Sequence, residues 1–335
     1  MARYPQIESV LELAQRVLKA RGYAVKTQKS YLSWIRQFLM YHRTCHPRSL
    51  REEHVLQFLE HLANRRLAPK SRNLAASSLS FLFREVRGTD VMKRVPRARG
   101  PQRRPAVLSH GAVLRVIKHL RGKYNLIGCL LYGTGMRLSE CLGLRVKDLD
   151  FDLRQIMVRN GKGQKDRHAI LPDHLRAALR RQVEKVSVLR DTGMTCGTNW
   201  APLPGAYHEK DPSAGFALRW QFLFPSSRIS TDPATGRRGR YHLNPSAMQR
   251  AMKEAVHKSG INQTATCHTL RHSFATELIR AGCDIRKLQR LMGHKDIRVT
   301  QHYLHVAEQS GLGIRSPLDR IDDEEWTADG MSGRD

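Results

Sequence analysis

The sequence predicts a mainly α-helical protein with a small antiparallel β-sheet, an α+β fold divided into two domains. Apolar residues recur at helical spacing through residues 1–87. Residues 88–106 then combine proline, glycine and arginine without such periodicity, which is typical of a basic linker that buries no core. A second domain is expected over 107–321, where helical patterns are interrupted by short strand-like segments joined by turns.

The first domain is expected to be a bundle of helices. Its apolar stripes place successive helices over residues 7–18, 31–39, 55–62 and 74–83. The opposite faces are basic, and the second helix carries Lys26, Lys29 and Arg36. A solvated helix face is the simpler interpretation of most single basic residues, so these three are candidates for contact with an anionic partner.

The second domain alternates helices with short strands. Ser109 is expected to cap a helix that runs through Leu120, and the apolar run 125–134 indicates a buried helix. Strand-like segments follow at 146–151, 155–159 and 167–171, with an Asn-Gly-Lys-Gly turn typical of a hairpin at 160–163. An amphipathic helix is predicted over 173–189 and a further strand over 222–225. The acidic residues 322–335 are predicted to form a disordered tail.

The charge balance indicates a polyanionic partner. Lys and Arg number 58 against 30 Asp and Glu, a formal net charge of +28, and nucleic acid is the usual partner of such a chain. A merely basic protein, such as a ribosomal one, is the alternative. The sequence contains no apolar run of about 18 residues, so no transmembrane helix is expected. The N-terminus lacks the apolar segment of a secretory signal. The 6 cysteines are scattered, which favours buried thiols in a reducing cytosol.

Reactive side chains gather near the C-terminal end of the chain. His268 and Arg271 share one face of a predicted helix, and a second short helix is expected to end at Gly293 with His294 just beyond it. Tyr303 follows in an amphipathic run. An arginine fork binds two phosphate oxygens, a histidine moves protons, and a tyrosine oxygen is a possible covalent nucleophile. The set is therefore suited to phosphoryl transfer through a protein-bound phosphoester.

This chemistry requires a second arginine and a proton donor, and both are present upstream. Arg137 is expected in the first turn of a helix, where the backbone dipole also favours an anion. Lys162 stands at the tip of the predicted hairpin, although an exposed loop lysine would look the same in isolation. Glu140 lies one turn after Arg137 and is expected to orient a neighbouring basic side chain.

The whole set resembles the catalytic residues of the tyrosine recombinases. The positions that match in order and spacing are Arg137, Lys162, His268, Arg271, His294 and Tyr303. The resemblance implies a C-shaped clamp in which residues 1–87 form a helical core DNA-binding domain and 107–321 form the catalytic domain. It further implies a bacterial, cytoplasmic protein associated with the nucleoid.

The resemblance also implies the reaction, a site-specific strand exchange in DNA. Tyr303 would attack a phosphodiester and stay attached to the 3′-phosphate, while Lys162 protonates the 5′-oxygen. Arg137 and Arg271 would neutralise the non-bridging oxygens, and His268 and His294 would donate hydrogen bonds. His268 is also a candidate base for the Tyr303 proton. No cofactor, neither metal nor ATP, is expected, and four active sites on two partners imply a tetramer on DNA.

Within the family, the chain most resembles the integron integrases. Residues 191–222 form an insertion rich in glycine, proline and aromatic residues, and a basic segment follows at 226–242. The segment 311–319 also resembles their C-terminus. Integron integrases exchange gene cassettes and accept a folded single strand with extruded bases. The candidates for stacking on such bases are Trp220, Pro233, Tyr241 and His242.

Several alternatives stay open. Trp220 is interpreted equally well as a packing residue. His268 and His272 form an HxxxH pair, but no carboxylate cluster accompanies them, so a metal site is disfavoured. A type IB topoisomerase uses the same residue types, and a non-catalytic DNA-binding relative is a further possibility. Among recombinases, a phage-type or chromosome-dimer-resolving enzyme acting on duplex DNA is the alternative to an integron integrase.

Overall fold

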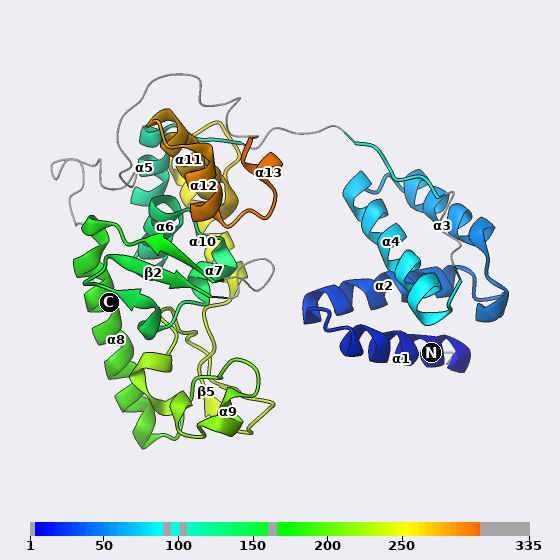
Figure 1. Ribbon diagram of the computed structural model, residues 1–335, viewed down its shortest axis with the longest axis horizontal. Coiled ribbons are helices and arrows are strands. Elements are labelled where there is room, and N and C mark those ends of the chain that lie inside the picture. Colours follow the sequence, from blue (N-terminus) through cyan, green and yellow to red (C-terminus); the bar gives the residue numbers. More distant parts are fainter. Residues whose placement is uncertain (1–3, 90–94, 101–105, 160–165, 302–335) are drawn as a thin grey trace. The chain divides into compact units, whose positions relative to one another are not determined.

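The computed structural model describes residues 4–89, 95–100, 106–159 and 166–301, and the chain separates into two compact units (Figure 1). The first unit spans Met1–Arg103 and the second spans Arg104–Asp335. Helices dominate both, and the strands are few, short and antiparallel. The predicted fold class, mainly α with a small antiparallel sheet, is therefore confirmed.

The first unit is the predicted bundle. Its helices are α1 (Pro5–Ala20), α2 (Val25–Tyr41), α3 (Glu52–Asn64) and α4 (Pro69–Phe81), and α4 continues into a π-helical turn at Leu82–Val86. Leu18, Ile35, Phe38, Leu79 and Phe83 are buried together in its core. These apolar side chains lie at the helical spacing that the sequence displays, so burial of one stripe per helix accounts for the bundle.

Part of the predicted linker is attached to this bundle. The side-chain amide of Asn73 in α4 donates to the Ala98 carbonyl at 3.0 Å and accepts from the Ala98 amide at 2.9 Å. Gly100 also lies against the Pro69 ring, where a Cβ would meet the ring carbons at 2.8 Å. Residues 95–100 therefore extend the first unit, because one asparagine satisfies both backbone groups of Ala98.

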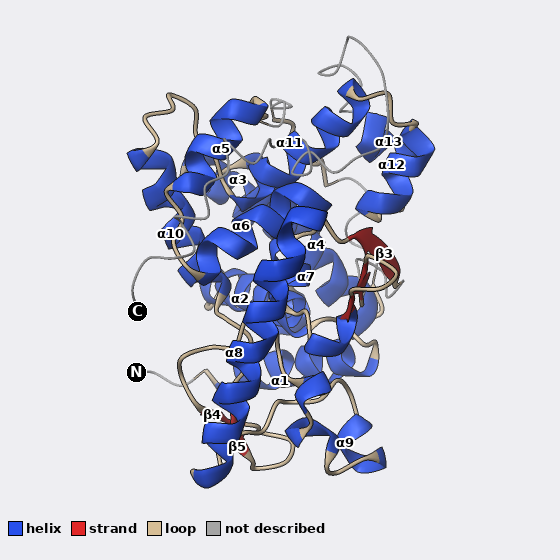
Figure 2. Ribbon diagram, turned by 90° about the vertical axis from the view of Figure 1, so that its left-hand side faces the viewer, coloured by secondary structure: helices blue, strands red, loops and turns tan. Residues whose placement is uncertain are grey.

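The second unit is built around a buried helix. Its longer helices are α5 (His110–Lys118), α6 (Lys123–Thr134), α8 (Arg176–Thr195), α10 (Pro245–Lys258) and α11 (Cys267–Arg280). Every α6 residue from Asn125 to Thr134 is buried, and α5 and α11 pack against this helix (Figures 1 and 2). Ser109 caps α5 by accepting from the Ala112 amide, as predicted. The shorter helices are α7 (Leu138–Leu142), α12 (Ile285–Met292) and α13 (Ile297–Gln301).

A three-stranded antiparallel sheet lies beside these helices. Its order is β1 (Leu149–Asp150), β2 (Gln155–Val158) and β3 (Arg167–Ile170), with Ile156 opposite Ala169 in the register of β2 and β3. The strand expected at 146–151 is wrong in its first half. Residues 146–148 instead form a 3-10 turn, because the Asp148 carboxylate accepts from the Arg145 amide at 2.9 Å and closes the turn.

The predicted insertion is a packed part of the second unit. It holds the short helix α9 (Tyr207–Lys210), and a two-stranded sheet of β4 (Ser230–Thr231) and β5 (Arg238–Gly239) follows it. Helix α8 runs to Thr195, six residues beyond its predicted end at Leu189. The strand expected at 222–225 is wrong, since only isolated bridges join Phe222 to Arg145 and Pro225 to His242.

Trp200 is the centre of this packed segment. Its indole is 1% exposed and donates from Nε1 to the Asp232 carboxylate at 2.9 Å. The Arg237 guanidinium lies 4.5 Å from the ring centroid, and Gly215 and Gly239 pack directly against Trp200. A buried indole with its N–H satisfied provides a large apolar contact area. Residues scattered over 200–239 are therefore held around one ring.

Arg145 attaches the segment to the rest of the unit. Its buried guanidinium donates to the backbone carbonyls of Trp220 and Pro202, the second at 2.6 Å. Buried charged donors of this kind stabilise only when their hydrogen bonds are satisfied.

Within the described residues, every helix is too short or too polar to cross a membrane.

Replacing Gly239 by alanine is expected to destabilise the Trp200 cluster. The new Cβ would lie 1.7 Å from the Trp200 carbonyl oxygen, so backbone must move, at a cost of about 1–3 kcal/mol. Thermal unfolding followed by tryptophan fluorescence should show a lower Tm. The control is Gly111→Ala in α5, where the nearest atom lies at 3.9 Å and the change should be neutral or stabilising. An unchanged Tm for Gly239→Ala would contradict this account.

Candidate active site

Arg271 occupies the centre of the site and is held by backbone carbonyls. Helix α11 is capped by Thr266 and carries Arg271 with only 3% exposure. The guanidinium donates to the carbonyl of Gly135, which ends α6, and at 2.6 Å to that of Met292, the last residue of α12. Helix C-termini carry partial negative charge, so two of them stabilise this cation.

Gly135 makes the close approach of these helices possible. It adopts φ +65°, the left-handed conformation that ends many helices. A Cβ at this position would lie 2.4 Å from the Phe274 ring and 2.9 Å from the Met292 sulfur. Only glycine therefore lets the Gly135 carbonyl reach Arg271 without displacing α11 or α12.

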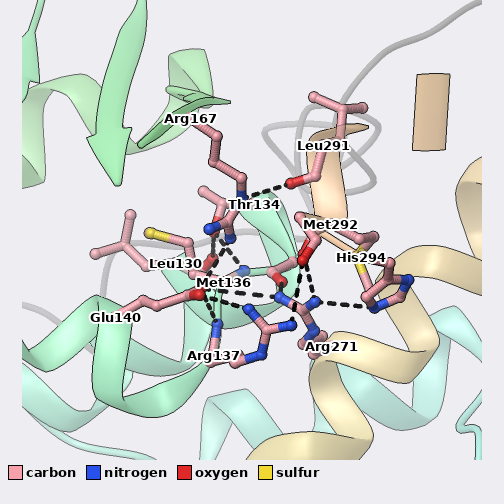
Figure 3. A network of polar contacts seen from close by, with 12 residues as sticks. Leu130, Thr134, Met136, Arg137, Glu140, Arg167, Arg271, Leu291, Met292 and His294 are labelled. Carbon is pink, nitrogen blue, oxygen red and sulfur yellow. Dashed lines mark hydrogen bonds and ion pairs between the residues drawn. The ribbon is translucent and has the colours of Figure 1, made fainter. Parts of the chain in front are cut away.

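Arg137 is fixed by Glu140. The sequence predicts this arginine in the first turn of a helix, but it is the N-cap residue that precedes α7. The Glu140 carboxylate accepts from the Arg137 amide at 2.8 Å and from its guanidinium at 2.6 Å, a capping box closed by an ion pair. The orienting role expected for Glu140 is confirmed. Figure 3 shows Arg137 and Arg271 side by side, with Glu140 at one end of the pair.

Glu140 is shared among three guanidinium groups. Arg167, which begins β3, lies 2.8 Å from the carboxylate, and Arg271 lies 3.9 Å from it. Burial by itself would raise the pKa of Glu140, but hydrogen bonds and charge from Arg167 and Arg137 outweigh it and lower the pKa to about 2. One ionised carboxylate among three cations leaves an excess of positive charge, as a bound phosphate would require.

His294 is placed by the end of α12. Gly293 ends that helix with φ +61°, and the next residue bonds to Gln289 through both backbone groups, each at 3.1 Å. The His294 ring lies between Arg271, 3.1 Å from Nε2, and Thr300, 2.9 Å from Nδ1. Since a guanidinium only donates, Nε2 accepts from Arg271, and the ring proton lies on Nδ1 facing Thr300.

Burial is the main cause that lowers the pKa of His294, to about 3, and the charges of Arg271, Arg137 and Arg167 add to it. The imidazole is therefore neutral at pH 7. His272, one turn after His268 in α11, has its pKa lowered to about 4 by burial first and then by the charges of His268 and Arg271. The site thus surrounds its arginines with uncharged imidazoles.

His268 lies on the same helix one turn before Arg271. Its side chain is exposed, and its ring centroid lies 6.3 Å from that of His272. Partial burial and then the charges of Arg271 and Arg137 lower the pKa of His268. Among the described residues, no three His, Cys, Asp or Glu side chains converge as a metal site would require. The two remaining predicted residues, Lys162 and Tyr303, lie outside the described residues.

Two further residues of this cluster, Arg167 and Thr300, carry no local sequence signal. Arg167 stood only as the start of a predicted strand, and Thr300 as one polar residue in an amphipathic run. Arg167 reaches Glu140, 27 residues before it in the chain. Thr300 contacts His294, which is near in sequence, but the contact depends on the turn between α12 and α13. Only the basic character of Arg167 distinguishes it within its strand.

Comparison with known proteins identifies the family. Residues 107–310 match the model described as the phage integrase family, and residues 10–93 match that of the phage integrase N-terminal SAM-like domain. The chain belongs to the phage integrase family. Its relatives include integrase/recombinases of Escherichia coli and Pseudomonas aeruginosa, each 41% identical over 325 residues, or 96% of both chains. The tyrosine recombinase XerA of Thermococcus kodakarensis is 30% identical, over 89% of this chain and 90% of its own.

Solved structures agree on the fold. A lambda integrase (75–356) dimer bound to a COC′ core site superposes with a TM-score of 0.63 at 18% identity, over 92% of this chain and 98% of the other. The recombinase XerH, bound to a palindromic difH substrate, gives 0.62 at 18% identity, over 89% and 82% of the two chains. Membership of this family and the similarity to the XerA recombinase identify the protein as a tyrosine site-specific recombinase, an enzyme that breaks and rejoins DNA strands.

The residues expected to bind DNA differ in exposure. In this recombinase Lys26 and Lys29 are exposed on α2, whereas Arg36 forms an exposed ion pair with Glu8 of α1 at 2.7 Å. Trp220 is 6% exposed, with the Tyr207 ring centroid 4.7 Å from its own and the Lys147 ammonium over its face. Its interpretation as a base-stacking residue is therefore corrected to that of a packing residue.

The other candidates for stacking remain near the surface. Tyr241 is 40% exposed and stacks on Phe222, with centroids 6.4 Å apart. His242 is half-buried and packs edge-on against the same ring at 5.5 Å, and Pro233 is exposed. The partly exposed tyrosine, backed by a buried phenylalanine, is the most suitable of these surfaces for a base.

The His294 imidazole is expected to stay neutral between pH 5 and 8 in the DNA-free protein. The reference pKa of histidine is about 6.5, and a value of about 3 lies well below this range. NMR of labelled histidine side chains would report the titration, with His294→Gln identifying the signal. In the unfolded chain His294 takes up a proton near pH 6.5, whereas in the folded protein it does not. The free energy of unfolding therefore decreases as the pH falls below about 6.5. The loss is up to about 1.4 kcal/mol per pH unit. A midpoint near 6.5 would contradict the described burial.

Proposed function

We propose that the cluster around Glu140 binds the scissile phosphate of DNA. The observation that carries this proposal is the pairing of Arg137 and Arg271 beside a single carboxylate, with neutral His294 at their edge. Two guanidinium groups present forks for both non-bridging oxygens of one phosphate. Their fixed position means that charge is stabilised without reorganisation when the transition state forms.

Lys162, Tyr303 and His268 complete the proposed site. The Tyr303 phenol oxygen attacks phosphorus and forms a bond to it, and the bond from phosphorus to the 5′-oxygen breaks. Lys162 supplies the proton that the leaving 5′-oxygen takes up. His268, whose lowered pKa favours the neutral imidazole, accepts the phenol proton. The 5′-hydroxyl of the partner strand then attacks the phosphotyrosine, reverses each proton transfer and seals the exchanged strand.

His294 acts in two stages in this scheme. In the DNA-free protein its Nε2 accepts from Arg271 and so holds the guanidinium in place. Donation to a phosphate oxygen requires a proton on Nε2, which follows from a tautomer change or from protonation beside the phosphate. A bound anion favours the charged imidazole and opposes the lowered pKa of the free state. DNA binding therefore changes His294 from an acceptor into a donor.

We further propose that the enzyme integrates and excises gene cassettes at integron attachment sites, including folded single-stranded sites. The folded segment around Trp200 supports this, since it places Tyr241 at the surface of the catalytic unit. The alternative, a phage-type or chromosome-dimer-resolving recombinase on duplex DNA, accords equally with the relatives. Strand exchange between two partners needs four active sites, so the proposed assembly is a tetramer, with the chain after Tyr303 docking on a neighbour.

Tyr303→Phe is expected to abolish a covalent protein–DNA adduct. The substrates are nicked suicide duplexes and folded hairpins with extruded bases, carrying a site selected by binding to the wild-type protein. Denaturing electrophoresis measures the adduct with metal chelated. The control, Tyr124→Phe, removes a hydroxyl remote from the Glu140 cluster and should leave the adduct unchanged.

The pattern of adducts decides between the substrates. An adduct on the hairpin that requires Tyr303 supports the integron proposal, and an adduct confined to duplex supports the alternative. An adduct that persists in Tyr303→Phe would refute the assigned nucleophile.

Tyr241→Ala is expected to weaken binding of the hairpin and to leave duplex binding unchanged. Loss of one stacked base costs about 1–3 kcal/mol, roughly a 5- to 150-fold rise in Kd. Gel-shift titration would measure both. The matched control is Ile229→Ala, because Ile229 is 41% exposed in the same segment but offers no ring. Equal effects on hairpin and duplex would remove Tyr241 from the proposed base contacts.

A further inference from the structure

Arg167 joins three elements of the second unit. It is the first residue of β3, yet its side chain is only 10% exposed because it leaves the sheet toward the arginine cluster. Its Nε donates to the Leu291 carbonyl in the last turn of α12 at 2.9 Å. Its Nη2 donates to the Glu140 carboxylate at 2.8 Å. Figure 3 shows the guanidinium between these two partners.

Both partners lie directly beside groups that face the proposed phosphate. Glu140 holds Arg137 through two hydrogen bonds. Leu291 precedes Met292, whose carbonyl accepts from Arg271, and lies three residues before His294. Arg167 also packs on the turn itself, since a Cβ on Gly293 would lie 3.1 Å from its Cδ. One side chain thus contacts the supports of both halves of the site.

The second role of Arg167 is electrostatic. Glu140 is an anion close to the place where a phosphate would bind, and it would repel that phosphate if Arg137 alone neutralised it. Arg167 pairs with the second carboxylate oxygen of Glu140, so Glu140 neutralises less of the positive charge of Arg137. Only an arginine offers divergent donors on one rigid plane for a carbonyl and a carboxylate at once.

We propose that Arg167 is a positioning residue for phosphate binding, and that it keeps Arg137 and His294 directed at the same phosphate while neutralising Glu140. It touches neither DNA nor the reacting atoms in this role. The proposal rests on the proposed function of Arg137, Arg271 and His294. It predicts a defect in transition-state stabilisation and not in DNA affinity, because the charge it balances matters most where the phosphate reacts.

Single-turnover cleavage by Arg167→Met and Arg167→Lys tests this role. On an ordinary phosphodiester the Met variant should cleave about 10- to 100-fold more slowly, the loss that a misplaced catalytic group brings. The Lys variant should recover part of the rate, and DNA binding should change little. The matched control is Arg154→Met, since Arg154 pairs with Asp173 on the surface with both side chains more than half exposed.

A methylphosphonate at the scissile position separates positioning from simple damage. Replacing one non-bridging oxygen by a methyl group removes the charge that the arginines neutralise. If Arg167 acts through these arginines, the ratio of the wild-type cleavage rate to that of Arg167→Met should be smaller on the methylphosphonate than on the ordinary phosphodiester. The comparison uses the methylphosphonate diastereomer that wild type cleaves. A defect of equal size on both substrates, or a Met variant as fast as wild type, would overturn the proposal. If the Met variant does not fold, the Lys variant decides by the same comparison.

A second readout requires no DNA. Arg167 is one of the charges that lower the pKa of His294. In Arg167→Met the NMR titration of His294 should move to higher pH, and in Arg154→Met it should not. An unmoved titration in a folded Arg167→Met would also overturn the proposal. If wild type itself forms no adduct, the proposed function fails, while this titration still decides whether Arg167 is coupled to His294.

Discussion

The second unit, Arg104–Asp335, depends on one buried carboxylate. Arginines from α7, β3 and α11 would repel one another if they met in the interior of the protein, and Glu140 makes their meeting possible. With its pKa lowered to about 2, this group remains ionised wherever the protein is folded under ordinary conditions. Uncompensated buried charges are strongly destabilising, so loss of the carboxylate would affect the fold and the site together.

Local patterns predicted most of the helices. Apolar spacing located the bundle helices and the buried α6, and Gly293 correctly marked the end of α12 before His294. Arg167 was missed, because its partners at 140 and 291 are brought to it only by the fold. The hydrogen-bond acceptors of Arg271 could not be predicted either, because Gly135 and Met292 contribute backbone carbonyl oxygens, which every residue has.

The segment after α8 shows the opposite limit. Its glycine, proline and aromatic content suggested an insertion, and the structure has short helices and turns there. Composition did not predict that Trp200 would become a core, because this needs Asp232, Gly215 and Gly239 to converge from distant positions. The burial of Trp220 has a similar origin. Arg145, far upstream, binds its carbonyl and brings the indole against the rest of the unit.

The carbonyl ligands of Arg271 have a consequence for sequence divergence. A side-chain ligand is lost by a single substitution, whereas a backbone oxygen persists through nearly all of them. The residues around Arg271 can therefore change while its guanidinium stays in the same position, provided that the backbone at the two helix ends keeps its conformation. Gly135 is the exception, since any larger residue would strike Phe274. Evolutionary constraint should thus fall on a residue that has no functional group of its own.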